Sequence, residues 1–572
     1  MGVAGIAHYV NKFLEKKNGK KESVMVNGII AGVCLLVPIQ MVSQTWDDHD
    51  RSGRYACRDF GQNYLNTLPD SCNPIIFTCG DNDTFPLWYN QEVEGERTDT
   101  RVCNLSYLQT DWYIDQMRRP AYDSPALPIT WERINYAGNT NMYVYVYPME
   151  KFIEQYRNAY PEKFHRAFGD NPYELNKITK HWILEADAEK KSEARLIVEE
   201  IISMYEKSIN KDRRERFVVP RNVIPTKTLY IPIDSAAVKR SGMLIPEEYA
   251  DNIPEYMTID ISDKNGLYRH ELVLFDMLAN ANWERPLYMS MTVGDSNFPR
   301  VLKKNFVHEG LAYRITPFDW SKAGYDPMSG EHPVDIDRFY DNVMNRFKWG
   351  GVKEADDYYA DETVRRMIST HRNLVSQLAT DMLTAGEPDE KILSVLDKWY
   401  TEFPKETIPY DALRDNSISI ADIYNILYSR NIDNGKQLDD ATLKTIVERK
   451  NEIANAILKH ETQQARWHNS LKPQEKNDGM LYHRLSLIEQ SWKILNNGAG
   501  EKAVTREELV DMLADMLNTE IEQLGKVRNR KAIEVKRALI GSIYHLYHDL
   551  EPSNAELRKV EKALMRFMNM HQ

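Results

Sequence analysis

Two aspartates stand close together directly after an apolar stretch of the sequence. Residues 75–92 read IIFTCGDNDTFPLWYNQE, with Asp81, Asn82 and Asp83 at the polar turn and Trp88 beyond it. Two carboxylates spaced D-x-D on one loop can share a small hard cation and hold it against a diphosphate. The same pattern also fits a turn with a helix cap, because a carboxylate at Asp83 can accept hydrogen bonds from free backbone N–H groups. These four residues are candidate ligand-binding residues, with Asp81 and Asp83 as candidate metal ligands, and the turn and cap is the interpretation we favour.

A second polar cluster lies at residues 46–54, which read WDDHDRSGR. Its candidate ligand-binding residues are Asp47, Asp48, His49, Asp50 and Arg51. The carboxylates offer hard oxygen ligands for a cation, the imidazole adds a nitrogen ligand, and an arginine can hold a phosphate. At a membrane surface, such a cluster would lie where a lipid-phosphate donor presents its head group. The interpretation we favour is a helix-capping, interfacial linker with Trp46 in the aromatic belt and the charges solvated.

Several classes of function have no support in the sequence. The formal net charge is -12, and no stripe of lysine and arginine alternates with aromatic residues, so nucleic acid is not expected as a partner. The sequence contains no GxSxG, Walker A, HExxH or long glycine-rich motif, so hydrolase, nucleoside-triphosphatase and zinc-protease chemistry are not indicated.

The segment just before the second cluster predicts a membrane span. Residues 24–43, VMVNGIIAGVCLLVPIQMVS, carry no charge over 20 positions, which is about the length that an α-helix needs to cross a bilayer. Upstream lysines mark the cytoplasmic flank: Lys12, Lys16, Lys17, Lys20 and Lys21. We therefore expect a cytoplasmic basic segment at 1–23 and a transmembrane helix at 24–44 in the inner membrane. The rest of the chain would then face the periplasm. A buried soluble helix and a cleaved signal peptide are the alternatives, but no small-x-small cleavage site follows the span.

The chain beyond the span divides into two predicted regions. Residues 45–351 alternate strand and helix patterns, which predicts an α/β outer domain. Its first unit is a strand at 73–79, a helix at 83–95 and a parallel strand at 100–108, with a ligand-competent crevice at the carboxyl ends of the strands. Further predicted strands are 141–149, 228–233, 257–261, 285–293 and 312–317, and further predicted helices are 112–119, 174–216 and 271–283. Residues 352–572 are nearly all helix-periodic, and we expect a tetratricopeptide-like helical repeat or a plain bundle.

The five cysteines leave the redox state open. Cys34 lies in the apolar run, and the others fall within fewer than 50 residues: Cys57, Cys72, Cys79 and Cys103. One or two disulfides would fit an oxidising compartment. We favour buried free thiols, because cysteine often serves as a small core residue.

Several long stretches of the chain resemble a known family of membrane proteins. They read QTWDDHDRSGRYACRDFGQNYL (44–65), IIFTCGDNDTFPLWYNQEVEGERTDTRVCNLSYLQTDWYIDQM (75–117), NWERPLYMSMTV (282–293), HEGLAYRITP (308–317) and YDNVMNRFKWGG (340–351). Over about residues 24–405 the chain is similar to the carboxyl-terminal half of large Bacteroidota membrane proteins of the protein O-mannosyltransferase-like family, also called glycosyltransferase family 117. The first two stretches are long enough to be specific.

The resemblance implies a division of labour. Members of this family carry an amino-terminal multi-span domain of the C type that takes sugar from a lipid-phosphate donor, and their catalytic acidic residue lies in its first outer loop. Residues 1–10, MGVAGIAHYV, look like the tail of an earlier span, so we expect this chain to lack the catalytic region and to work with an upstream multi-span transferase half. The implied role is to bind acceptor protein or to brace the transferase. No catalytic role is carried over to the acidic residues named above.

Two other functions stay open from the sequence. One is a non-enzymatic envelope scaffold that acts through the helical region, and the other is a metal-dependent glycosyltransferase built on the D-x-D pattern. Against the second, a domain outside the cytoplasm would not meet nucleotide sugars. No cofactor is indicated apart from the lipid-phosphate-linked sugar donor that the resemblance implies.

Overall fold

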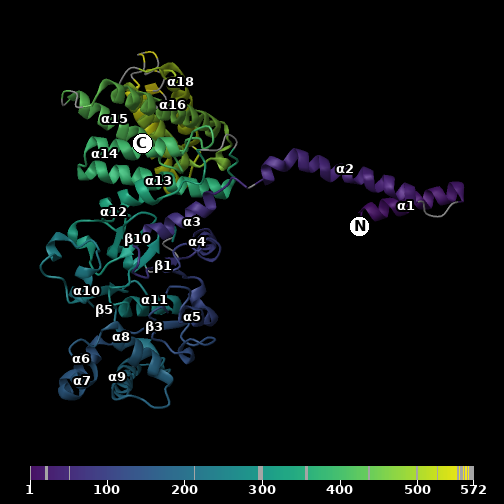
Figure 1. Ribbon diagram of the computed structural model, residues 1–572. Coiled ribbons are helices and arrows are strands. Elements are labelled where there is room, and N and C mark those ends of the chain that lie inside the picture. Colours follow the sequence, from purple (N-terminus) through teal and green to yellow (C-terminus); the bar gives the residue numbers. More distant parts are fainter. Residues whose placement is uncertain are drawn as a thin grey trace.

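The computed structural model of the chain has an N-terminal pair of helices and a larger body of two parts (Figure 1). It describes residues 2–550 except 20–23, 51, 212, 294–299, 354–357, 434, 436, 437, 498, 499 and 525, and also positions 553, 555, 558, 561, 562 and 565. An apolar helix, an α/β region and an all-helical region follow one another along the chain. This order confirms the predicted fold class.

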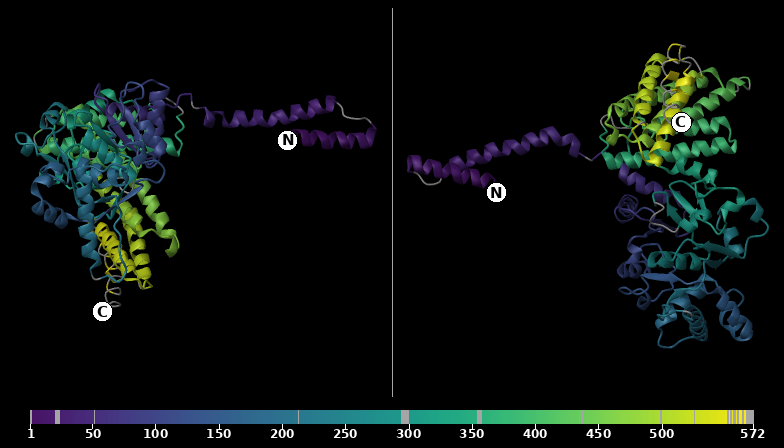
Figure 2. Two further views of the ribbon diagram at one scale, coloured as in Figure 1. Left: turned by 90° about the horizontal axis from the view of Figure 1, so that it is seen from below. Right: turned by 180° about the vertical axis from the view of Figure 1, so that it is seen from behind.

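The N-terminal helices project away from the body in all views (Figures 1 and 2). α1 (Gly2–Asn18) lies alongside α2 (Val24–His49), and Asn11 donates a hydrogen bond to Asn27 between them. Among the described residues, one helical stretch, Val24–Trp46, is long and apolar enough to cross a membrane, and none of it is buried against the body. Because exposing so much apolar surface to water is unfavourable, this length and composition suit a membrane anchor or a signal sequence.

A five-stranded mixed sheet lies at the centre of the α/β region. Its strand order is β2-β1-β8-β10-β9, in which β1 pairs in parallel with β2 and β8, and β10 pairs antiparallel with β8 and β9. The strands are β1 (Ile75–Thr78), β2 (Arg101–Asn104), β8 (Leu287–Ser290), β9 (Phe306–His308) and β10 (Ala312–Ile315). Every residue of β1, β2 and β8 is buried, which explains why these strands are mostly apolar without alternation.

The two faces of this sheet belong to different hydrophobic cores. Ile76 packs in a core that also contains α3 (Ala56–Thr67) and the C-terminal helices, whereas Ile75 and Phe77 pack in the core of the remaining α/β region. Successive strand residues point to opposite faces, so one short strand serves both cores. The C-terminal helices therefore share a core with the sheet, and the domain boundary at 351/352 stays a prediction.

Close packing fixes the helix that follows β1. α4 (Asp81–Glu92) crosses α3 at Gly61, where any side chain would collide with the backbone carbonyl of Pro86. Asn90 donates hydrogen bonds of 2.8 Å to that carbonyl and to the carbonyl of Arg58 in α3. The position of the first turn of α4, which carries Asp81 and Asp83, is thus set by α3 as well as by the sheet.

The rest of the α/β region is built on two smaller sheets, β4-β3-β7 and β5-β6. Their strands are β3 (Tyr143–Val146), β4 (Val223–Ile224), β5 (Thr228–Pro232), β6 (Tyr256–Asp260) and β7 (Gly266–Tyr268). The helices are α5 (Asp111–Met117), α6 (Glu150–Ala159), α7 (Pro161–Phe168), α8 (Leu175–Lys177), α9 (Glu193–Asn210), α10 (Ser235–Arg240), α11 (Arg269–Asn280) and α12 (Ile336–Asp341).

The helix expected at 174–216 is interrupted. α8 continues into a π-helix, η3 (Ile178–Ile183), and a 3₁₀-helix, η4 (Leu184–Asp187). A new helix, α9, begins after Ser192, whose side chain accepts a hydrogen bond from the backbone N–H of Arg195. The N-cap serine explains the new start, and the π-helix before it is a rare geometry that is frequent at functional sites.

The C-terminal region is helical throughout its described length. Its helices are α13 (Glu362–Ala385), α14 (Asp389–Glu402), α15 (Ser417–Asp433), α16 (Asp440–Ser470), α17 (Asp478–Asn496), α18 (Arg506–Leu524) and α19 (Arg530–Asp549). α13 ends at Gly386, whose φ of 75° is favourable for glycine. Helix lengths range from 14 to 31 residues, so the tetratricopeptide-like interpretation stays a prediction.

Candidate functional site

Asp83 lies buried at the carboxyl edge of the central sheet. Its carboxylate accepts hydrogen bonds from the backbone N–H groups of Cys79 (3.3 Å) and Gly80 (2.8 Å). It also accepts from the hydroxyls of Ser290 (3.2 Å) and Thr292 (2.8 Å), at and after the end of β8. Three of these donors meet at Oδ2 and the Gly80 N–H meets Oδ1, so the carboxylate ties the turn after β1 to the end of β8.

The neighbouring predicted residues point elsewhere. Asp81 and Asn82 are exposed in the first turn of α4, while Asp83 is only 3% exposed. Trp88 is half-buried and stacks on Tyr107 with a centroid distance of 6.3 Å. The structure therefore does not turn the two aspartates toward a shared cation, and it places Asp83 as the residue that ties α4 to the ends of β1 and β8.

Other polar residues close the same edge of the sheet. The hydroxyl of Thr84 in α4 contacts the hydroxyl of Thr78 (2.7 Å) and accepts a hydrogen bond from Asn104 (3.0 Å). Thr78 and Asn104 are the last residues of β1 and β2. The polar groups at this edge therefore bond one another, and the ligand-competent crevice expected there stays a prediction.

The predicted cluster at 46–54 is spread along the exit from α2. The backbone of Asp47 and Asp48 forms the last turn of α2, and His49 ends it, exposed. Asp50 accepts hydrogen bonds from the backbone N–H and the hydroxyl of Ser52, which lower the pKa of its carboxyl. Arg51 lies outside the described residues. A ligand site at this cluster stays a prediction.

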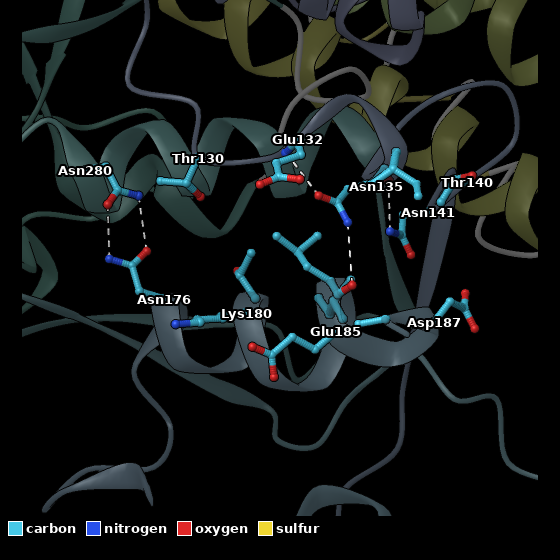
Figure 3. Close-up of a pocket in the computed structure, with 15 residues that line it drawn as sticks. Thr130, Glu132, Asn135, Thr140, Asn141, Asn176, Lys180, Glu185, Asp187 and Asn280 are labelled. Carbon is cyan, nitrogen blue, oxygen red and sulfur yellow. Dashed lines mark hydrogen bonds between the residues drawn. The ribbon is translucent and has the colours of Figure 1, made fainter. Parts of the chain in front are cut away.

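A cavity of about 750 Å³ lies elsewhere in the α/β region, at a place that the sequence did not indicate (Figure 3). One wall comes from residues 130–141, and the other from α8, η3 and η4. The volume is in the range of small-molecule sites. The polar groups on its walls are mostly side-chain amides and hydroxyls: Thr130, Asn135, Thr140, Asn141, Asn176 and Asn280.

The walls of the cavity are joined by amide contacts. Asn176 and Asn280 donate to each other's side-chain oxygens at 3.2 and 3.1 Å, and Figure 3 shows this pair at one end of the cavity. Asn135 accepts from the backbone N–H of Glu132 (3.0 Å) and lies 3.5 Å from the carbonyl of Leu184 on the opposite wall. The amides are therefore held in fixed orientations before any ligand enters.

A buried carboxylate supports this end of the cavity. Asp276, in α11, is fully buried and accepts hydrogen bonds from the backbone N–H (2.6 Å) and hydroxyl (2.7 Å) of Thr130 and from the amide of Asn280 (3.3 Å). Burial raises the pKa of its carboxyl to about 6, against the hydrogen bonds from Thr130, which lower it. Asp276 thus positions two lining residues from behind.

Among the residues that the structure describes, neither place brings three metal-ligating atoms within 4.8 Å of one another. Among the described residues, one group of three such side chains has its ligand atoms within 4.8 Å, namely Glu489, His545 and Asp549. It lies on the surface of the helical region, where Lys493 forms ion pairs with both carboxylates. Neither Asp81 nor Asp83 belongs to such a group within the part of the chain that the structure describes.

The cysteines are free thiols at all five positions. Cys57 is exposed and Cys103 is buried, while Cys72 and Cys79 are intermediate. Burial raises the pKa of the Cys57, Cys72 and Cys103 thiols. The interpretation as free thiols agrees with this structure, in which no pair of these residues is joined.

Comparison with known families bears on the α/β region. Residues 57–337 match the family model described as TMEM260-associated domain 2. This region is a TMEM260-like domain. The match starts in α3 and ends in α12, so the TMEM260-like domain contains both the Asp83 edge and the cavity. No curated protein and no solved structure matches the chain.

Proposed function

We propose that the chain is a membrane-anchored part of a glycosyltransferase-like protein, in which the TMEM260-like domain binds the acceptor and supports the transferase. The observation that carries this proposal is the family match over residues 57–337, directly after a helix with the length and composition of a membrane span. The resemblance of the chain to protein O-mannosyltransferase-like proteins of Bacteroidota agrees with it.

The proposed location is the outer face of the inner membrane. Five lysines precede α2, and such clusters stay on the cytoplasmic side. The TMEM260-like domain and the helical region would then lie in the periplasm, close to the lipid-phosphate-linked sugar donor of a multi-span transferase. A reporter fused after Gln572 tests this orientation, and a cytoplasmic signal would contradict it.

The proposed role is acceptor binding and not sugar transfer by a D-x-D metal site. Asp83 is buried and bonded to four donors of the protein, while Asp81 is exposed in the same turn, so the two carboxylates do not face a shared site. The cavity supplies a preorganised binding site in the same domain. The helical region, which shares a core with the central sheet, would hold the TMEM260-like domain rigidly as a brace.

Glycopeptide mass spectrometry tests the function. Cells that make this chain natively would have its gene deleted and would then be complemented with the full chain or with a chain that lacks residues 57–337. We expect the occupancy of O-glycosylated sites to fall on deletion and to recover with the full chain alone. Unchanged occupancy in the deletion strain, together with defects in envelope assembly, would favour the scaffold function.

A further inference from the structure

We infer that the cavity between residues 130–141 and η3–η4 binds an uncharged, hydroxyl-rich saccharide, such as a sugar unit on a glycosylated acceptor. This inference rests on the proposed function and names the chemistry of the ligand. It follows from the groups on the cavity walls, their fixed orientations and the balance of charge.

The amides on the walls retain unused hydrogen-bonding capacity. An asparagine side chain offers two N–H donors and two acceptor lone pairs. Asn176 uses one donor and one lone pair with Asn280, and one of each remains. Thr140, exposed at the rim, adds a hydroxyl that can donate and accept. A ligand that both donates and accepts at many positions matches such walls, and sugar hydroxyls do this.

The lining also includes aliphatic surface. Ile134, which is 75% exposed, and the half-buried Leu184 of η4 supply most of it, whereas Ile183 of η3 is only 2% exposed. The C–H face of a sugar ring packs on such side chains while its hydroxyls reach the amides. A purely ionic ligand would leave these aliphatic groups without contacts.

The charges on the walls disfavour anionic ligands. Three carboxylates line the cavity, those of Glu132, Glu185 and Asp187, against the single ammonium group of Lys180. A phosphate or a nucleotide would meet net negative charge there. The carboxylates of Glu132 and Asp187 suit sugar hydroxyls, because carboxylate oxygens accept strong hydrogen bonds from O–H donors. The carboxylate of Glu185 already bonds to His181 and Ser192.

The support behind the walls makes the site preorganised. Asn280 is held by Asp276 as well as by Asn176, and Thr130 is held by the same carboxylate. The π-helix η3 sets the opposite wall. Fixing the binding groups in advance lowers the ordering cost that a ligand must offset.

Saturation-transfer NMR on the purified full chain in detergent micelles tests this inference. The probes are methyl glycosides of glucose, mannose, galactose and N-acetylglucosamine, with glucose 6-phosphate and an unglycosylated peptide as comparators. We expect saturable binding of at least one neutral glycoside. The Asn176→Ala variant, which removes one amide, should bind about threefold to tenfold more weakly, as expected for one or two lost hydrogen bonds.

Two further variants control the test. Thr140→Trp fills the rim of the cavity and should abolish the signal, whereas Asn139→Ala removes an exposed amide of the same segment that does not line the cavity and should leave it unchanged. The inference is overturned if no neutral glycoside binds, if both cavity variants bind like the natural chain, or if glucose 6-phosphate or the peptide binds as tightly. If deleting residues 57–337 lowers glycan occupancy but the full chain binds no saccharide, this inference alone is rejected. If the full chain binds a saccharide but the deletion leaves occupancy unchanged, the proposed function is rejected.

Discussion

Replacing Asp83 by alanine tests whether its carboxylate has a structural role or is a metal ligand. The substitution removes the acceptor for two backbone N–H groups and two hydroxyls. The hydroxyls of Ser290 and Thr292 lie 2.6 Å apart and can bond each other, so the backbone N–H groups of Cys79 and Gly80 carry most of the loss.

The expected size of this effect follows from those two groups. A buried donor left without an acceptor costs about 1–3 kcal/mol, and a lost helix cap costs about 0.5–2 kcal/mol. Because both descriptions count the same N–H groups, we expect Asp83→Ala to lower the free energy of unfolding by about 2–4 kcal/mol. Asp83→Asn keeps one acceptor oxygen and should cost about half as much.

The matched control is Asp81→Ala, two residues earlier in the same turn. Its side chain is exposed, so it should cost no more than about 1 kcal/mol through the helix dipole. Pulse proteolysis of the full chain across a urea series measures these differences. The series is run with and without manganese at about 1 mM, the upper end of the dissociation constants of weak divalent-cation sites. Equal effects of the two substitutions, or stabilisation by manganese that needs both aspartates, would refute the structural assignment.

Three further predictions follow from other buried groups. The pKa of Asp276 is about 6 in the folded chain against an ordinary value of 3.8, so its contribution to stability is greatest below pH 4 and is lost as pH rises through 6. Relative to Asp276→Asn, the natural chain should lose about 2–3 kcal/mol of unfolding free energy between pH 4 and pH 7, and a pH-independent difference in urea unfolding would contradict this. Arg372 is fully buried, and its guanidinium lies 2.7 Å from Asp415 and donates to three backbone carbonyls. Arg372→Met should therefore lower the free energy of unfolding by about 3–5 kcal/mol, measured as a lower Tm of the helical region. An unchanged Tm would show that this ion pair is dispensable. Iodoacetamide should modify the exposed Cys57 in the native chain and the buried Cys103 only after unfolding. Peptide mass spectrometry measures the order of modification, and earlier modification of Cys103 would contradict this prediction.

The sequence predicts the first unit of the fold well because its signals are local. The apolar run before Asp81 gives β1, and the parallel pairing of β1 with β2 is confirmed. The helix between them starts at Asp81 and not at 83, because Gly80 is the N-cap and Asp83 is its third residue. The role favoured for Asp83, a turn and helix cap, agrees with its hydrogen bonds, although the partners Ser290 and Thr292 are about 200 residues away and no local pattern indicates them.

The elements that the sequence analysis missed depend on distant contacts. β4, β7 and β9 are two or three residues long, too short to show a period. The cavity was missed because its walls come from three separate segments, and its asparagines look like ordinary loop residues. The sequence predicts one helix over 174–216, so it gave no local signal of the π-helix η3 that forms one wall.

The buried charges were also beyond sequence reasoning. Glu309 is completely buried, where it accepts a hydrogen bond from Tyr288 (2.6 Å) and pairs with Arg338 (3.4 Å) and Arg314 (3.7 Å). Burial raises the pKa of its carboxyl. In the sequence it is only the neighbour of His308. Its three partners come from different elements, so only the fold reveals that it belongs to a structural network.

The most direct measurement of the central claim is glycan occupancy in cells that carry one altered amide. Asn176→Ala would replace the natural chain, with Asn139→Ala in a parallel strain, and glycopeptide mass spectrometry would compare occupancy at equal chain abundance. If the cavity of the TMEM260-like domain serves protein glycosylation, occupancy falls with Asn176→Ala and stays unchanged with Asn139→Ala. Equal occupancy in the two strains would contradict the claim.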